Sequence, residues 1–101
     1  MLEGPLSKDR AKYCLIECLH SGRVIYTVHF RQEMRNDGLN LTDVVRVCRS
    51  GAVVDAPEPD ARSGVWKYRI QGRWLDSTIA AVVFTFNAEA SAVLITIFRR
   101  N

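Results

Sequence analysis

The segment from Thr78 to Arg100 contains two long apolar runs, and they limit the folds open to this chain more than any other feature. β-Branched and aromatic residues dominate both runs, Ile79–Phe86 and Val93–Phe98, and such residues favour strands over helices. The five residues between the runs are small or polar, which is typical of a hairpin loop. We therefore expect two central antiparallel strands. In both runs the residues that would point to either face of a strand are apolar. We therefore also expect other elements to cover both faces of the sheet.

The length and composition of the chain indicate one folded domain spanning residues 1–101. Hydrophobic residues make up 48% of the sequence and charged residues 25%, which is an ordinary globular balance and excludes wholesale disorder. Lys and Arg number 14 against 11 acidic residues, and 11 of the 14 are Arg. The planar guanidinium group suits phosphate and carboxylate, so the composition permits a nucleic-acid partner without requiring one.

The cysteine pattern gives no reason to expect a metal site. Cys14, Cys18 and Cys48 are an odd number of thiols without the paired spacing of zinc ligands. We interpret them as free thiols in a reducing compartment. The longest apolar run is far shorter than the roughly 20 residues of a membrane span, and the N-terminus lacks the apolar core of a signal peptide. A soluble cytoplasmic protein without a cofactor is the expectation.

Capping residues and apolar spacing predict three helices in the first half of the chain. Ser7 is a candidate N-cap for a first helix that ends at Ser21-Gly22. Residues 23–28 look like a short strand or an extended entry, and residues 28–37 like a short helix that ends before Gly38. Asn40 begins a third helix, which ends before Gly51.

The strand period predicts the remaining elements. Residues 52–56 form a first strand, and residues 57–60, with two prolines, form an exposed loop. Residues 65–70 alternate, with Trp66, Tyr68 and Ile70 on one side and Val65, Lys67 and Arg69 on the other. The dipeptide Gln71-Gly72 ends this strand. Three helices before about four antiparallel strands predict an α+β fold with helices packed on a sheet.

Cations near the predicted sheet are the main candidates for function, because no phosphate loop, zinc motif or serine-hydrolase elbow is present. Lys67 and Arg69 share one strand face, Arg73 follows a turn, and Arg99 and Arg100 end the last strand. If the strands are neighbours, these side chains form a basic cleft that binds phosphate. The alternative is a solvated face on an outer strand and a polar tail.

His29 lies where an extended segment meets a helix, a position from which an imidazole can point into a cleft. Imidazole can donate or accept a proton near neutral pH. A structural histidine that forms a hydrogen bond at an element boundary is the alternative. Trp66 and Tyr68 alternate with the basic pair on the side expected to be buried, which favours core packing for Trp66.

The segment VHFRQEMRNDGLNLTDVVRVCRSGAVVDA, followed by WKYRIQG and by a final strand LITIFRR, resembles a family of small bacterial proteins of uncertain function. That family is similar to the MqsR-type and RelE/ParE-like toxins of toxin–antitoxin pairs. The resemblance covers about residues 24–100. It implies helices against a curved antiparallel sheet, an endoribonuclease that cleaves mRNA without a metal ion, and an antitoxin protein as partner, with RNA bound either free or on the ribosome.

The resemblance also implies roles for individual residues. His29 occupies the position of the family's histidine and is the candidate base, with Lys67 and Arg69 beside the phosphate and Tyr68 as a weaker catalytic candidate. The candidates for binding RNA phosphates are Arg31, Arg73 and Arg99. Glu33 and Asp37 stand where the family pattern carries arginines, which weakens the positive field. The alternative is a non-catalytic interaction module, such as a ParE-like gyrase inhibitor, that uses the same surface.

Overall fold

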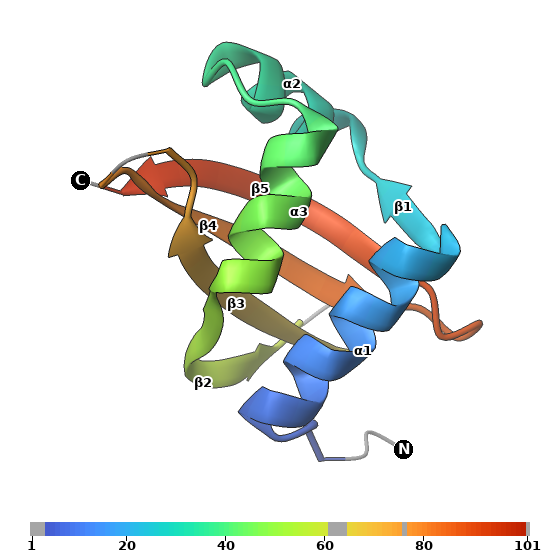
Figure 1. Ribbon diagram of the computed structural model, residues 1–101. Coiled ribbons are helices and arrows are strands. Elements are labelled where there is room, and N and C mark those ends of the chain that lie inside the picture. The colour runs from blue at the N-terminus through green and yellow to red at the C-terminus, as the bar shows by residue number, and fades with distance from the viewer. Residues whose placement is uncertain (1–3, 61–64, 76, 101) are drawn as a thin grey trace.

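The computed structural model describes residues 4–60, 65–75 and 77–100 (Figure 1). Within these residues the chain forms three helices and one open five-stranded sheet, which confirms the α+β class. The elements are α1 (Lys8–Ser21), β1 (Val24–Tyr26), α2 (Val28–Asn36), α3 (Leu41–Ser50), β2 (Ala52–Pro59), β3 (Trp66–Arg73), β4 (Ile79–Phe86) and β5 (Ala92–Arg100). None of the described helices is long and apolar enough to span a membrane.

Side-chain caps fix the starts of the helices close to where the sequence predicts them. The Ser7 side chain accepts a hydrogen bond from the Arg10 amide at the start of α1, and Gly22 ends that helix with φ 77°. Thr27 caps α2 in the same way. At α3, Asn40 and Asp43 form a reciprocal capping box.

The sheet has the order β1-β5-β4-β3-β2, so the predicted hairpin of β4 and β5 lies inside it. Strands β2, β3, β4 and β5 pair antiparallel. Strand β1 pairs parallel with β5, which makes the sheet mixed and gives five strands instead of about four. Of the predicted segment 23–28, Val24–Tyr26 is therefore a strand of the sheet, whereas Thr27 and Val28 begin α2.

Two predicted strand ends are wrong. Strand β2 continues to Pro59 and pairs across Glu58 and Lys67, because prolines are tolerated on an edge strand and a bulge follows Val54. Strand β3 continues through Gly72 to Arg73. Gly72 does not break this strand; it lets the backbone of α3 come so close that a Cβ there would collide with the Val47 carbonyl oxygen.

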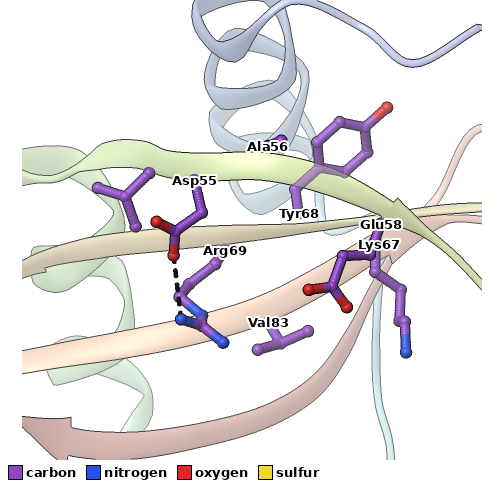
Figure 2. A pocket seen from close by; sticks show the side chains of 8 residues that line it. Asp55, Ala56, Glu58, Lys67, Tyr68, Arg69 and Val83 are labelled. Atoms are coloured by element: carbon purple, nitrogen blue, oxygen red, sulfur yellow. Dashed lines mark hydrogen bonds and ion pairs between the residues drawn. The ribbon is translucent and has the colours of Figure 1, made fainter.

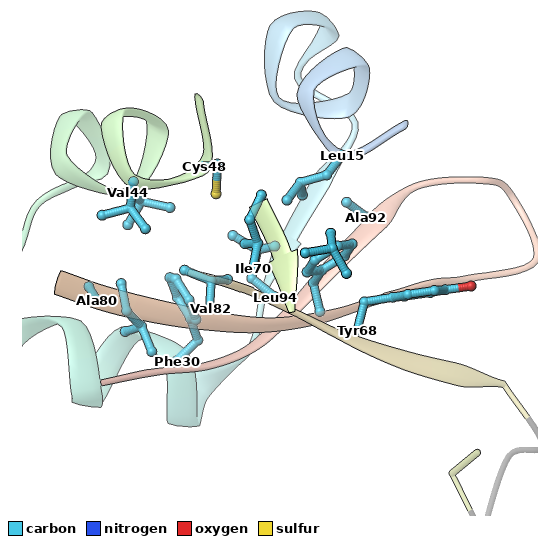
Figure 3. Close-up of a cluster of buried hydrophobic side chains, with 14 of the residues drawn as sticks. Leu15, Phe30, Val44, Cys48, Tyr68, Ile70, Ala80, Val82, Ala92 and Leu94 are labelled. Atoms are coloured by element: carbon cyan, nitrogen blue, oxygen red, sulfur yellow. The ribbon is translucent and has the colours of Figure 1, made fainter. Parts of the chain in front are cut away.

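The hydrophobic core lies between one face of the sheet and the helices α1 and α3 (Figure 1). Helix α2 packs along β5, and its Phe30 is fully buried in the core. Figure 3 shows the side chains that meet there; the fully buried large ones include Leu15, Phe30, Val44, Val47, Ile70, Val82, Phe84, Leu94 and Ile97.

The second face of the sheet is not covered by α1 or α3, which corrects the expectation of cover on both faces. Apart from the fully buried Ala81, its apolar side chains are only partly shielded, in part by long neighbours. The guanidinium carbon of Arg69, for example, lies 5.8 Å from the centre of the Phe98 ring. We call this second side the open face. By strand alternation and register it carries Lys67, Arg69, Gln71, Arg73, Ile79, Ala81, Val83, Thr85, Val93, Thr96, Phe98 and Arg100.

Candidate functional site

One transverse row of the open face brings together residues from three neighbouring strands. Arg69 pairs with Val83 across β3 and β4, and Val83 pairs with Thr96 across β4 and β5. Side chains that are directly opposite in register project from the same face. Arg69 and Thr96 therefore stand on either side of Val83, with about 10 Å between their Cα atoms, which is two strand spacings.

His29 joins the β5 end of this row from the first turn of α2. The Thr27 side chain caps α2 and also donates a hydrogen bond to the Ile95 carbonyl oxygen, which fixes the start of the helix against β5. The Nε2 atom of His29 lies 3.3 Å from the Oγ1 atom of Thr96. Phe30, the next residue, turns into the core, whereas His29 is exposed. The imidazole is therefore accessible at the edge of the open face.

Arg69 occupies the other end of the row. Its Nη1 atom lies 3.1 Å from the Oδ2 atom of Asp55, and the Arg69 side chain is 37% exposed. The guanidinium group is thus held by one exposed carboxylate and by the Phe98 ring, with part of its surface still open to solvent. A phosphate could approach Arg69 from the side of Val83 and form charge-assisted hydrogen bonds.

Lys67 lies two residues from Arg69 on the same face, and both line a hollow beside the β2 bulge (Figure 2). The hollow is bounded by Val54, Asp55, Ala56, Glu58, Lys67, Tyr68, Arg69 and Val83. Figure 2 shows the Lys67 and Arg69 side chains on the same side of β3. The sequence predicted this pair, and the structure places both of them with Val83 at one hollow.

Acidic side chains reduce the positive charge both around this hollow and, separately, near His29. Asp55 lies in the β2 bulge, which follows Val54, and Glu58 lies where regular pairing resumes, opposite Lys67. Both line the hollow. Glu33 lies one turn after His29, on the same flank of α2. An anion that binds at the hollow must therefore compete with carboxylates for the cations.

Tyr68 is not brought to the row. Its side chain points to the other side of β3 from Lys67 and Arg69 (Figure 2), and it is 5% exposed. Its hydroxyl oxygen accepts a hydrogen bond from the Leu6 amide at 2.9 Å, and its ring stacks on Phe84. Tyr68 is a core residue here, as the alternation with Trp66 and Ile70 already indicated.

The three further arginine candidates lie in different places. Arg99 is on the helix-covered side, where its guanidinium carbon lies 5.4 Å from the centre of the Trp74 ring. Arg31 is exposed and two residues from His29, which puts it on another flank of α2. Only Arg73 projects from the open face, at the exposed end of β3.

The cysteines lie outside this site. Cys48 belongs to the buried face of α3, and burial raises the pKa of its thiol to about 12. A thiol that stays protonated at neutral pH is a poor nucleophile. Among the described residues, no group of three or more His, Cys, Asp or Glu side chains could hold a metal ion.

Sequence reasoning missed Thr96, Asp55 and Phe98. The alternation of β5 could have put Thr96 and Phe98 on one face, but which face depends on the bulge between β4 and β5 near Val83. Asp55 stands in a short strand with no motif around it. Its contact with Arg69 depends on the β2 bulge, which the sequence does not reveal.

Comparison with known proteins identifies a family and no activity. The sequence profile of a family described as a domain of unknown function, DUF4258, matches residues 26–99. The match begins at the end of β1 and includes every residue of the row, and it gives no link to MqsR-type or RelE/ParE-like toxins. No curated protein and no solved structure matches the chain.

Proposed function

The chain belongs to the DUF4258 family, whose function is unknown, and we propose from its geometry that the open face binds RNA and cleaves it without a metal ion. One observation carries the proposal. An exposed imidazole, His29, and a half-exposed guanidinium group, Arg69, stand at the two ends of one row, with only Val83 and Thr96 between them. A base and a phosphate-binding cation on one accessible face are the two parts that cleavage at the ribose 2′-hydroxyl needs.

In the proposed reaction His29 acts as the general base. It takes the proton of the 2′-hydroxyl, whose oxygen attacks the adjacent phosphorus atom. A new 2′ oxygen–phosphorus bond forms, the bond from phosphorus to the 5′ oxygen breaks, and that oxygen leaves with a proton from water. The products are a 2′,3′-cyclic phosphate and a 5′-hydroxyl end. Thr96, at 3.3 Å, orients the imidazole.

Arg69 and Lys67 stabilise the charge that builds on the phosphate oxygens. In the free protein the Arg69 Nη1 atom donates a hydrogen bond to the Asp55 carboxylate. When RNA binds, the guanidinium group must either release Asp55 or bind the carboxylate and the phosphate at the same time. Asp55 is 68% exposed, so water can take over its solvation when the pair opens.

The resemblance to RelE/ParE-like and MqsR-type toxins supports a toxin of a toxin–antitoxin pair as the biological setting. In that setting an antitoxin protein would cover the open face and block access of RNA to His29. The apolar side chains exposed there, among them Ile79, give such a partner a surface to bury.

The test is to incubate the purified protein with total RNA in the presence of a chelator and to compare matched variants. We expect His29→Ala to lower the cleavage rate by about 10²–10⁴-fold, the usual contribution of general base catalysis. His20→Ala is its control, because His20 lies in the last turn of α1. Arg69→Ala should lose about 10²–10³-fold, with Arg99→Ala on the other side of the sheet as its control. Cleavage that survives both site variants would refute the assignment.

A non-catalytic interaction module is the second candidate, and the partly exposed apolar side chains of the open face favour it. Ile79 is 36% exposed, and Val83 and Phe98 are half-buried. This candidate predicts that the protein cleaves no RNA yet arrests growth on expression, and that Arg69→Ala relieves the arrest while Arg99→Ala does not.

A further inference from the structure

The cations of β3 continue along the open face beyond the row that contains His29. Residues two apart on a strand share a face and are separated by about 6.6–6.8 Å. Lys67, Arg69, Gln71 and Arg73 therefore form one line of polar side chains on the open face. Arg73 stands about 13–14 Å from Arg69, which is four residues along the strand.

A second arginine meets Arg73 at the far end of this line. Ile79 pairs in register with Arg73 on one side and with Arg100 on the other. Arg100 is two residues from Phe98 and four from Thr96, so its side chain also belongs to the open face. Two arginines therefore flank the side chain of Ile79, which is 36% exposed.

Both guanidinium groups are available to an anion. Arg73 and Arg100 are exposed, and no carboxylate within residues 4–60, 65–75 and 77–100 forms an ion pair with either of them. Asp55 and Glu58 lie beside Arg69 and Lys67 at the other end of β3. Of the carboxylates that the structure describes, those next to the line of cations therefore lie at its Lys67–Arg69 end.

The floor beside the cations is apolar and carries one aromatic ring. Ile79 and Val83 on β4 and Phe98 on β5 expose apolar surface on this face, whereas Ala81 between them is fully buried. A basic line that follows a backbone, next to a surface on which bases can lie, is the arrangement that binds single-stranded nucleic acid. A duplex keeps its bases paired inside, so it would leave this floor without a partner.

We propose that Arg73 and Arg100 form a second phosphate subsite, and that a single RNA strand runs along β3 from the His29–Arg69 row to this subsite. The proposal rests on the proposed function and adds the path and the single-stranded character of the substrate. It assigns a binding role to Arg100 and none to its neighbour Arg99, which lies on the helix-covered side of the sheet beside Trp74.

The experiment measures binding of 2′-O-methyl oligonucleotides, which have no 2′-hydroxyl to attack, by fluorescence anisotropy. The oligonucleotides have two to eight nucleotides, and the proteins are the wild type, Arg73→Ala/Arg100→Ala and the control Arg49→Ala/Arg99→Ala, which removes the same charge from the helix side. We expect the first double variant to bind the long oligonucleotides at least 10-fold more weakly and the dinucleotide nearly unchanged. Its slope of log affinity against log salt should fall by about 1.4, for two phosphate contacts.

Equal loss in the two double variants would overturn the subsite, because it would reflect net charge alone. Binding of an acidic peptide such as poly-glutamate in place of the oligonucleotides would overturn it in favour of a protein partner. A length-dependent loss with no cleavage of ordinary RNA would support the subsite while refuting the catalytic proposal, so the two failures are distinguishable. Arg73→Gln/Arg100→Gln replaces the alanine variant if that variant unfolds, and the same losses are expected.

Discussion

Asp55 combines a left-handed backbone conformation with the contact that occupies Arg69. Its φ of 62° lies in the left-handed region, which costs free energy for most residues other than glycine, asparagine and aspartate. It stands in the β2 bulge, and its carboxylate lies 3.1 Å from the Arg69 guanidinium group. The bulge thus places a removable anion where we expect the substrate phosphate to bind.

Asp55→Asn should therefore strengthen nucleic-acid binding. Asparagine tolerates the left-handed conformation, so the substitution removes the charge and leaves the bulge intact. We expect a several-fold tighter affinity for a 2′-O-methyl oligonucleotide, measured at fixed salt by fluorescence anisotropy. Asp9→Asn in α1 removes the same charge far from the site and should leave the affinity unchanged. Weaker binding of Asp55→Asn would mean that Asp55 holds Arg69 in its binding position instead of competing for it.

At the scale of elements, the close approach of α3 to β3 explains the glycine inside the strand. A Cβ on Gly72 would lie 2.8 Å from the Cα atom of Gly51, in addition to its collision with the Val47 carbonyl oxygen. These are backbone atoms, so relief requires that the helix move away from the sheet. Gly72 lies on β3 between Arg69 and Arg73, and its fit to α3 helps to set the line of cations.

Gly72→Ala should destabilise the protein by about 1–3 kcal/mol or more, the usual cost of overpacking. Urea unfolding monitored by circular dichroism measures the loss. Gly4→Ala is the control, because an added Cβ there meets nothing within 4 Å. Equal midpoints for the two variants would contradict the close approach.

The sequence predicted elements well where local signals decide them. The caps Ser7 and Asn40 marked the starts of α1 and α3, and the β-branched runs marked β4 and β5. The sequence-based prediction was wrong where contacts with distant parts of the chain determine the structure. Gly72 was predicted to end a strand, but it lies inside β3 where α3 comes close. Pro59 was predicted to lie in a loop, but it belongs to the edge strand β2.

At the scale of the molecule, the two sides of the sheet have different roles. Helices α1 and α3 cover one side and form the core, and the other side carries the row and the line of cations. The sequence grouped His29 with Lys67 and Arg69, but it also added Tyr68 and Arg99, which face the core side. Strand alternation alone separates Tyr68 from its neighbours. Arg99 could not be assigned, because its face depends on the register of β5 against β4.

The central claim is that nucleic acid binds to the open face of the sheet, and the most direct test is to determine which face the ligand contacts. Methyl NMR during titration with a 2′-O-methyl oligonucleotide measures it, because Val82 and Val83 are adjacent residues on opposite sides of β4. We predict that the methyl signals of Val83 and Ile79 and the ring signals of His29 shift, while those of the core residues Val82 and Ile97 stay in place. Shifts confined to the helix side, or no shifts with oligonucleotide in excess, would contradict the account.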